Sequence, residues 1–282
     1  MADPYRISSR RSISLTRLSP DAPKGTNREA IKVLADRYEK ELGELDDLLY
    51  AARQHSLLVV LQGRDTAGKD GTIRKILDNT NALGVRVESF KVPTELDLSH
   101  DFLWRVHAKV PARGEIVLFN RSHYEDVLVT RVHGLVSEPE IKARYDAIND
   151  FERLLAGSGT IVMKFFLHIS LDEQEARLLE REKEPEKAWK LAVGDWKERS
   201  HWDEYTEAYE LALSRCASSG APWQIVAANQ KWYRNYVVLK SVVEQLRPYR
   251  KRWLESLDAL GRSRNAEILA YRNESQRKRS RR

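Results

Sequence analysis

The 282-residue chain has little of several features on which common protein classes depend. It holds one cysteine, Cys216, so an internal disulfide cannot form, and we expect a reducing, cytoplasmic setting. No run of about 18 apolar residues occurs, so no membrane span is expected. The first 17 residues lack the apolar segment of a secretory signal. The sequence also lacks a Cys/His metal spacing, a GxGxxG dinucleotide pattern and an arguable Ser-His-Asp arrangement.

The formal charge of +6 lies at the two ends of the chain. Residues 262–282 hold eight basic and two acidic side chains, and residues 1–26 hold five and two. The stretch between them carries a small negative charge. Basic ends of this kind are typical of solvated, flexible arms. We therefore expect basic arms at 1–26 and 261–282, a single domain at 27–260, and no specific nucleic-acid binding by that domain.

Apolar runs and helical periodicities alternate along the central part of the chain. Short runs rich in branched residues predict strands at 56–62, 85–90, 115–119, 160–169 and 223–227. Helices are expected after Pro93 and at 27–53, 69–81, 121–132, 138–155, 172–182 and 232–247. This alternation predicts an α/β fold with a parallel sheet covered by helices on both faces. Active sites in such sheets lie beyond the carboxyl ends of the strands.

The most informative stretch, LLVVLQGRDTAGKDG, runs from Leu57 to Gly71. A buried strand, a Gly63-x4-Gly68-Lys69 loop and a helix follow one another, which is the context of a Walker A P-loop. Backbone N–H groups and the helix N-terminus form a positive pocket, to which Lys69 adds a charge. Besides Lys69, the residues predicted to bind phosphate here are Gly63, Arg64, Ala67, Gly68, Asp70 and Gly71.

Two carboxylates make this P-loop unusual. Asp70 stands where a Ser or Thr normally holds magnesium, and Asp65 lies inside the loop itself. A Mg²⁺ ion between Asp65 and the phosphates explains that charge, and Mn²⁺ could take its place. The alternative is that Asp65 caps the loop. Asp70 could simply favour the dipole of the following helix.

A second cluster follows the strand at 115–119. Asn120 takes the place of the Asp that ends a Walker B strand, and Arg121 follows with a guanidinium suited to phosphate oxygens. Glu125 could supply the missing carboxylate to the metal or to the acceptor, although it could also be an exposed charge at a helix start. Arg131 lies two turns further along and could add charge to the same cleft.

A third cluster suggests a helical lid at about 182–205. This segment contains Pro185, Gly194 and three tryptophans, which suits a jointed lid better than a core helix. Lids bring cations onto a transferring phosphoryl group. The candidate cations here and on the preceding helix are Arg177, Arg181, Lys183, Lys187, Lys190 and Arg199, each of which, taken alone, could be an ordinary surface charge.

Together these residues indicate a P-loop phosphotransferase whose catalytic groups are Asp65, Lys69, Arg121 and Glu125. Two other interpretations remain open. One is an ATP-dependent nucleotide or small-molecule kinase. The other is a non-catalytic P-loop module that binds nucleic acid through the basic ends.

Several motifs in combination resemble the polyphosphate kinase type 2 family over residues 30–250. They are GRDTAGKDG, SHDFLWRVH, FNRSHYEDVLVTRVH, KAWK, GDWKERSHWDEY and APWQIVAANQKWYRN. The resemblance implies a P-loop kinase fold like that of thymidylate kinase, with a lid. It also implies reversible, Mg²⁺-dependent phosphoryl transfer between inorganic polyphosphate and purine nucleotides, by a protein that forms homo-oligomers.

The resemblance also assigns roles to particular residues. It implies that Asp65 is linked to the metal, that Lys69, Arg121 and Arg131 bind phosphate, and that Arg177, Lys187 and Arg199 are lid contacts. The FNRSxYED form, with Asn120, resembles the subgroup that accepts both AMP and ADP.

Overall fold

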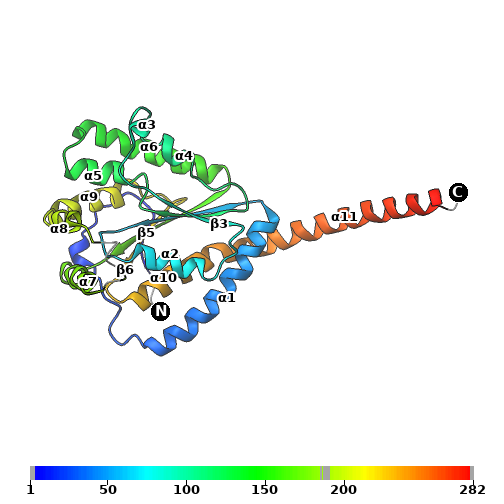
Figure 1. Ribbon diagram of the computed structural model, residues 1–282, viewed down its shortest axis with the longest axis horizontal. Helices are drawn as coiled ribbons and strands as arrows, with labels where there is room; N and C mark the ends of the chain where they lie inside the picture. Colours follow the sequence, from blue (N-terminus) through cyan, green and yellow to red (C-terminus); the bar gives the residue numbers. More distant parts are fainter. Residues whose placement is uncertain (1–3, 185, 187–190, 280–282) are drawn as a thin grey trace.

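The computed structural model describes residues 4–184, 186 and 191–279. Its centre is a sheet with the strand order β1-β6-β5-β2-β4-β3 (Figure 1). The strands are β1 (Tyr5–Ile7), β2 (Ser56–Gln62), β3 (Val85–Ser89), β4 (Ile116–Asn120), β5 (Thr160–His168) and β6 (Trp223–Ala227). Strands β2 to β6 run parallel, which confirms the predicted α/β fold, and β1 joins β6 in the antiparallel sense.

Helices cover both faces of this sheet because its central strand β2 is apolar from Leu57 to Leu61. All seven residues of β2 are buried, and their side chains alternate between two cores. Leu58 and Val60 belong to the core beneath α5, α6 and α9, whereas Leu57 and Val59 belong to the core beneath α1, α2 and α10 (Figure 1).

Most of the helices begin and end near the residues that the periodicity indicates, but α9 and α11 were not predicted. The helices are α1 (Arg28–Ala52), α2 (Lys69–Leu77), α3 (Glu95–Leu98), α4 (Trp104–His107), α5 (Glu125–Val132), α6 (Glu138–Gly157), α7 (Leu171–Lys183), α8 (Val193–Arg199), α9 (Trp202–Arg215), α10 (Lys231–Leu246) and α11 (Arg250–Arg279). Helix α5 starts four residues later than expected. Arg121 has a φ of 63°, which a continuous helix does not allow.

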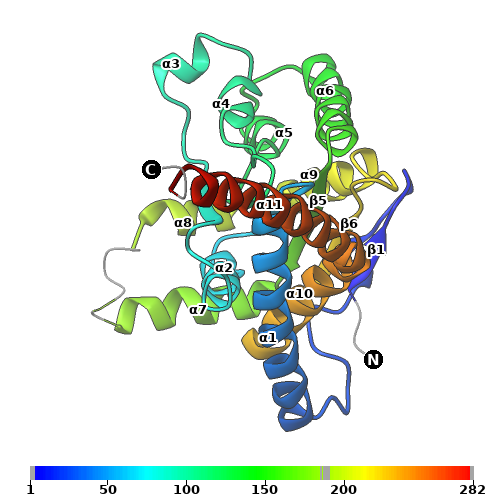
Figure 2. The same cartoon turned by 90° about the vertical axis from the view of Figure 1, so that its right-hand side faces the viewer.

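The two ends of the chain differ from the irregular arms expected from their charge. At the N-terminus, β1 adds a strand to the edge of the sheet beside β6 (Figure 2), and Ile7 and Leu15 are buried. At the other end, α11 starts with Trp253 buried in the core and continues away from the body (Figure 1). The expected domain boundary at 260 therefore falls inside a helix. The basic composition of the two ends predicted flexible arms, because it gave no weight to the few apolar residues that pack each end against the domain.

The sheet register determines where the candidate site forms. Leu61, near the end of β2, pairs with Asn120 on one side and Phe165 on the other. The loop after β2 and the turn after β4 therefore leave the same edge of the sheet side by side. Within the described residues, no helix combines the length and hydropathy that a membrane crossing requires.

Candidate active site

The P-loop (residues 63–69) connects β2 to α2. Gly63 and Gly68 both have positive φ, at 155° and 102°. A Cβ on Gly63 would lie 2.9 Å from the Leu167 carbonyl oxygen, so only glycine fits there. Lys69 is folded back along its own loop, where its Nζ donates to the carbonyl oxygens of Gly63 (2.6 Å) and Arg64 (3.1 Å). These bonds fix the ammonium at the centre of the loop.

Arg121 joins the two catalytic carboxylates that the sequence suggests. Its Nη2 lies 2.5 Å from Asp65 Oδ1, and its Nη1 lies 3.1 Å from Glu125 Oε2. The positive φ of Arg121 turns the chain at the end of β4, so that its side chain meets the P-loop. The structure therefore brings Asp65, Lys69, Arg121 and Glu125 into one cluster.

Charges within this cluster bias its protonation. Burial acts to raise the pKa of Asp65, but the charges of Arg121 and Lys69 outweigh it and lower the pKa below its usual value. The pKa of Lys69 is lowered by burial and by the charge of Arg121. The pKa of Arg121 is raised, first by Glu125 and also by Asp65. Asp65 and Arg121 therefore stay ionised at neutral pH.

The two unusual positions of the motifs contact each other. Asn120, in the Walker B-like position, donates from Nδ2 to Asp70 Oδ1 at 3.0 Å. Asp70 thus faces the end of β4 from the first turn of α2. This contact links the P-loop helix to the strand that carries Arg121.

A cavity of about 840 Å³ opens beside the cluster. Gly63, Asp65, Arg121 and Glu125 line one end of it. Aromatic and aliphatic side chains line much of the rest, including Phe90, Phe102, Val129, Leu135 and Tyr205. Its size lies in the usual range for small-molecule sites, and its mixed lining suits a ligand with both a charged and a flat apolar part.

Sequence reasoning gave no role to a charged group in the cavity wall. Arg105 Nη2 lies 3.6 Å from Asp126 Oδ2, and Arg144 Nη1 lies 3.7 Å from Asp126 Oδ1. Burial raises the pKa of Asp126, against the two arginine charges. Arg105 lies within the SHDFLWRVH motif, which was the available signal, but spacing along the chain does not show that it meets Asp126.

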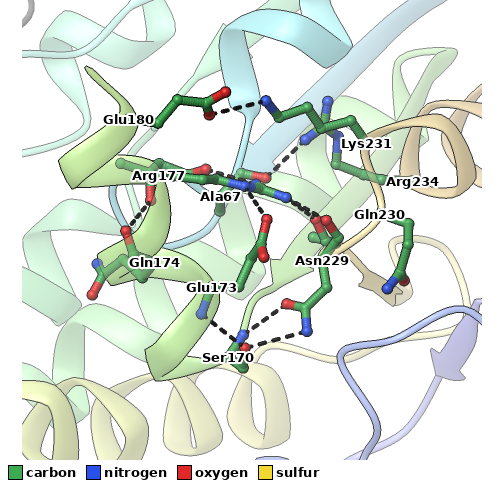
Figure 3. A network of polar contacts seen from close by, with 12 residues as sticks. Ala67, Ser170, Glu173, Gln174, Arg177, Glu180, Asn229, Gln230, Lys231 and Arg234 are labelled. Carbon is green, nitrogen blue, oxygen red and sulfur yellow. Dashed lines mark hydrogen bonds and ion pairs between the residues drawn. The ribbon is translucent and has the colours of Figure 1, made fainter. Parts of the chain in front are cut away.

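Two buried arginines, Arg177 and Arg234, donate hydrogen bonds to backbone carbonyls of the P-loop and so support it (Figure 3). Arg177 donates from Nη1 to the Thr66 carbonyl (2.8 Å) and from Nη2 to the carbonyls of Ala228 (2.8 Å) and Asn229 (2.6 Å). Its Nε donates to Glu173 at 2.8 Å. Arg177 was expected to be a lid contact. In the structure, its guanidinium instead donates hydrogen bonds to the backbone carbonyls of Thr66, Ala228 and Asn229.

The other supporting residue, Arg234, was missed by sequence reasoning. Its Nη1 donates to the Ala67 carbonyl at 3.1 Å, and a Cβ on Gly68 would lie only 1.8 Å from that nitrogen. Burial and the charge of Arg177 lower the pKa of Arg234 to about 10. Arg234 lies in the motif APWQIVAANQKWYRN, but the sequence does not show that its side chain points at Gly68.

Arg64 packs against α9 and, together with Trp202, lines the same cavity. Its guanidinium carbon lies 3.5 Å from the centroid of the Trp202 ring, and its Nη2 donates to the Trp202 carbonyl. Arg64 is 8% exposed. Burial lowers its pKa to about 10 despite the nearby carboxylates of Asp203 and Glu210.

The remaining predicted cations are distributed around the cavity. Arg131 is held between Glu138 (2.5 Å) and Glu207 (2.9 Å), away from the P-loop cluster. Arg181 pairs with Asp195 of α8 at 2.8 Å. Arg199 lines the cavity and contacts Leu171, Gln174 and Glu175 of α7. Lys183 is the last residue of α7. Pro185, Lys187 and Lys190 lie outside the described residues.

Comparison with known proteins identifies the family of the chain. The family model for Polyphosphate kinase 2 (PPK2) matches residues 26–253. An AMP/ADP-polyphosphate phosphotransferase of Meiothermus ruber is 51% identical over 245 residues, covering 86% of this chain and 91% of that protein. An ADP-polyphosphate phosphotransferase of Rhodopseudomonas palustris is 40% identical over 247 residues, covering 83% and 84%.

A solved structure shows the same fold. Polyphosphate kinase 2 from Arthrobacter aurescens TC1 superimposes with a TM-score of 0.81 at 39% identity, covering 87% of this chain and 92% of that one. The family suggested by the sequence motifs is therefore confirmed. This chain belongs to the polyphosphate kinase 2 family.

Proposed function

We propose that this protein transfers the terminal phosphoryl group of inorganic polyphosphate to AMP and ADP, forming ADP and ATP in a reversible reaction. The observation that carries the proposal is the meeting of Arg121 and two carboxylates at one end of a cavity with an apolar wall, next to a P-loop whose centre is occupied by the Lys69 ammonium. The names of the two relatives support it, since one is an AMP/ADP-polyphosphate and the other an ADP-polyphosphate phosphotransferase.

The cluster suits a divalent metal. Mg²⁺ in phosphotransferases is usually held by one or two carboxylates together with substrate phosphates, and Asp65 and Glu125 provide such a pair. The lowered pKa of Asp65 keeps its carboxylate ionised, as a metal ligand must be. When bound, Mg²⁺, or Mn²⁺ in its place, would neutralise charge on phosphate oxygens.

The chain's own residues contribute alignment and charge. An acceptor phosphate oxygen is already ionised near neutral pH, so transfer needs no strong general base. The carbonyls of Gly63 and Arg64 occupy two of the three ammonium donors of Lys69, which leaves the third for a phosphate oxygen. Arg121 presents a planar fork to the transferring group, and both cations favour the charge that spreads over its oxygens.

The surroundings of the cluster complete the proposal. Lys183 and Arg199 belong to the segment that we propose as a lid, Arg181 pairs with Asp195 of that segment, and Arg199 already lines the cavity. We further propose that the protein acts in the cytoplasm and forms homo-oligomers, with the exposed side of α1 as a candidate contact surface.

One assay tests the proposal. The protein is incubated with polyphosphate, Mg²⁺ and one of AMP, ADP, GMP or GDP, and nucleotide products are separated and quantified. We expect ATP from ADP, and ADP followed by ATP from AMP. The absence of product with all four acceptors would contradict the proposal. Phosphorylation with ATP as the only effective donor would favour an ordinary nucleotide kinase.

A further inference from the structure

Arg64 occupies the second position of the P-loop, yet its side chain is built into the interface with α9. The guanidinium stacks on the Trp202 ring at 3.5 Å and donates from Nη2 to the Trp202 carbonyl (2.7 Å) and to Thr206 Oγ1 (2.5 Å). The Tyr209 ring lies 5.9 Å away. Within the described part of the chain, the buried Nε of Arg64 has no hydrogen-bond partner.

This arrangement differs from that of a phosphate ligand. A guanidinium that binds phosphate presents its planar fork to the oxygens. Here one edge of the fork is bonded to α9, and one face of the plane is covered by Trp202. A buried cation on an aromatic face is stabilised without an acidic partner, so the contact can hold Arg64 in place by itself.

A second contact holds the neighbouring residue from the same side. Gln174 of α7 donates from Nε2 to the Asp65 carbonyl at 3.3 Å, and its Oε1 accepts from Arg199 of α8 at 3.1 Å. The side chain of Asp65 is the group that pairs with Arg121. The backbone of residues 64 and 65 is therefore fixed by α7, α8 and α9, whereas residues 66 and 67 are fixed by Arg177 and Arg234.

We propose that Arg64 is a positioning residue, which fixes the P-loop to α9 through Trp202 and thereby sets the position of Asp65. This inference rests on the proposed phosphotransfer and deepens it. Trp202 is the first residue of α9 and follows α8 closely. Any displacement of α8 and the start of α9 is therefore transmitted through Arg64 to the catalytic cluster.

Steady-state kinetics distinguish this role from direct phosphate binding. Arg64→Lys keeps the charge but loses the fork, and Trp202→Leu removes the aromatic face. We expect each to lower kcat for polyphosphate-dependent ATP formation by about tenfold to hundredfold, as misplacement of a catalytic group does. The KM for polyphosphate should change less than about twofold, because substrate contacts remain. Trp202→Phe, which keeps a ring beneath the guanidinium, should restore most of kcat.

A double variant supplies the decisive comparison. If the two residues act as one unit, Arg64→Lys combined with Trp202→Leu should be no slower than the worse single variant. If the two single-variant losses of kcat multiplied in the double variant, the inference would be overturned. The same would follow from a raised KM with an unchanged kcat in Arg64→Lys, which would make Arg64 a phosphate ligand. Arg153→Lys, on an exposed position of α6, is the matched control for a charge-conserving change.

An unfolding measurement does not depend on turnover. Across the Arg64→Met and Trp202→Leu cycle, we expect a coupling of about tenfold in the unfolding equilibrium constant, the size of a desolvated cation–π contact. Additive effects would overturn the inference. Coupling without any polyphosphate-dependent turnover of the wild type would instead overturn the proposed function and leave the contact established.

Discussion

The cations on the two sides of the P-loop have different partners. The facing cations are Lys69, whose ammonium lies at the centre of the P-loop, and Arg121, which lines the cavity and pairs with carboxylates that a metal could take over. The supporting arginines, Arg177 and Arg234, donate to backbone carbonyls of residues 66 and 67. Figure 3 shows both arginines beside Ala67. Carboxylate partners can be exchanged when substrate binds, whereas carbonyls of the loop itself stay in place. Lys69 also donates to two loop carbonyls, but its third ammonium donor remains for a phosphate oxygen. The supporting arginines, by contrast, shape the site without binding phosphate.

The backbone of the loop explains why such support is needed. Thr66 has a φ of 62°, a left-handed conformation that is costly for a β-branched residue. Gly68 has a φ of 102°. Left-handed residues of this kind turn successive N–H groups toward a common point, which makes an anion-binding concavity. Arg177 holds the Thr66 carbonyl on the opposite side and so stabilises the strained form.

The largest effect is expected from the facing lysine. Lys69→Ala removes the charge at the centre of the loop, and Asp65→Asn removes the carboxylate proposed to hold the metal. Each should lower polyphosphate-dependent turnover by about 10³-fold or more, measured as ATP formed from ADP. The circular dichroism spectrum should stay that of the wild type. Turnover near the wild-type rate in either variant would remove the site assignment.

Arg121→Gln should be the next most severe change to turnover. A charged phosphate contact that acts in the transition state is typically worth about 10² to 10³ in rate, so kcat should fall by that amount. The free energy of unfolding should fall by less than about 1 kcal/mol, because Arg121 is a partly exposed ion-pair partner. A large loss of stability would show that Arg121 supports the loop as Arg177 does.

For the supporting arginines we expect a large loss of stability and a smaller loss of turnover, the reverse of the expectation for Arg121. Arg177→Gln leaves the carbonyls of Thr66, Ala228 and Asn229 unpaired in a buried site. Chemical denaturation should show a loss of about 3 kcal/mol in the free energy of unfolding, together with a smaller loss of turnover than in Arg121→Gln. Unchanged stability with lost turnover would place Arg177 among the facing cations.

Gly68→Ala tests the closeness of Arg234 to the loop. The added Cβ meets both a positive φ and the Arg234 guanidinium, so a loss of about 1–3 kcal/mol in the free energy of unfolding is expected. In an Arg234→Met background the clash is absent and only the backbone penalty remains. The loss caused by Gly68→Ala should then be smaller, and an equal loss would contradict the predicted contact.

The smallest predicted effect is on the pH dependence of kcat/KM for polyphosphate. Because the pKa of Lys69 is lowered by burial and by Arg121, Lys69 loses its charge at a lower pH than an exposed lysine does. The kcat/KM for polyphosphate, which reports on the free enzyme, should therefore decline on the alkaline side below the usual lysine pKa of about 10.4. Arg234, with a pKa of about 10, keeps its charge through most of this range. A decline only above the usual lysine value would contradict the assignment.

The difference between the facing cations and the supporting arginines also explains which parts of the site could be predicted from the sequence. Buried runs such as 57–61 predict strands because every residue is apolar, and the P-loop spacing places Lys69 in the phosphate-binding loop. The direction of an arginine is not encoded locally, because Arg64, Arg177 and Arg234 find their carbonyl and aromatic partners only after folding. Strand β1 and helix α11 were missed since a few apolar residues outweigh an overall basic composition.

The most direct test is a crystal structure of the protein with Mg²⁺ and a non-hydrolysable polyphosphate analogue. We predict phosphate oxygens within hydrogen-bond distance of Lys69 and Arg121, with Arg177 and Arg234 still bonded to the carbonyls of Thr66 and Ala67. An analogue bound away from the P-loop, or supporting arginines turned from these carbonyls onto phosphate, would contradict the account.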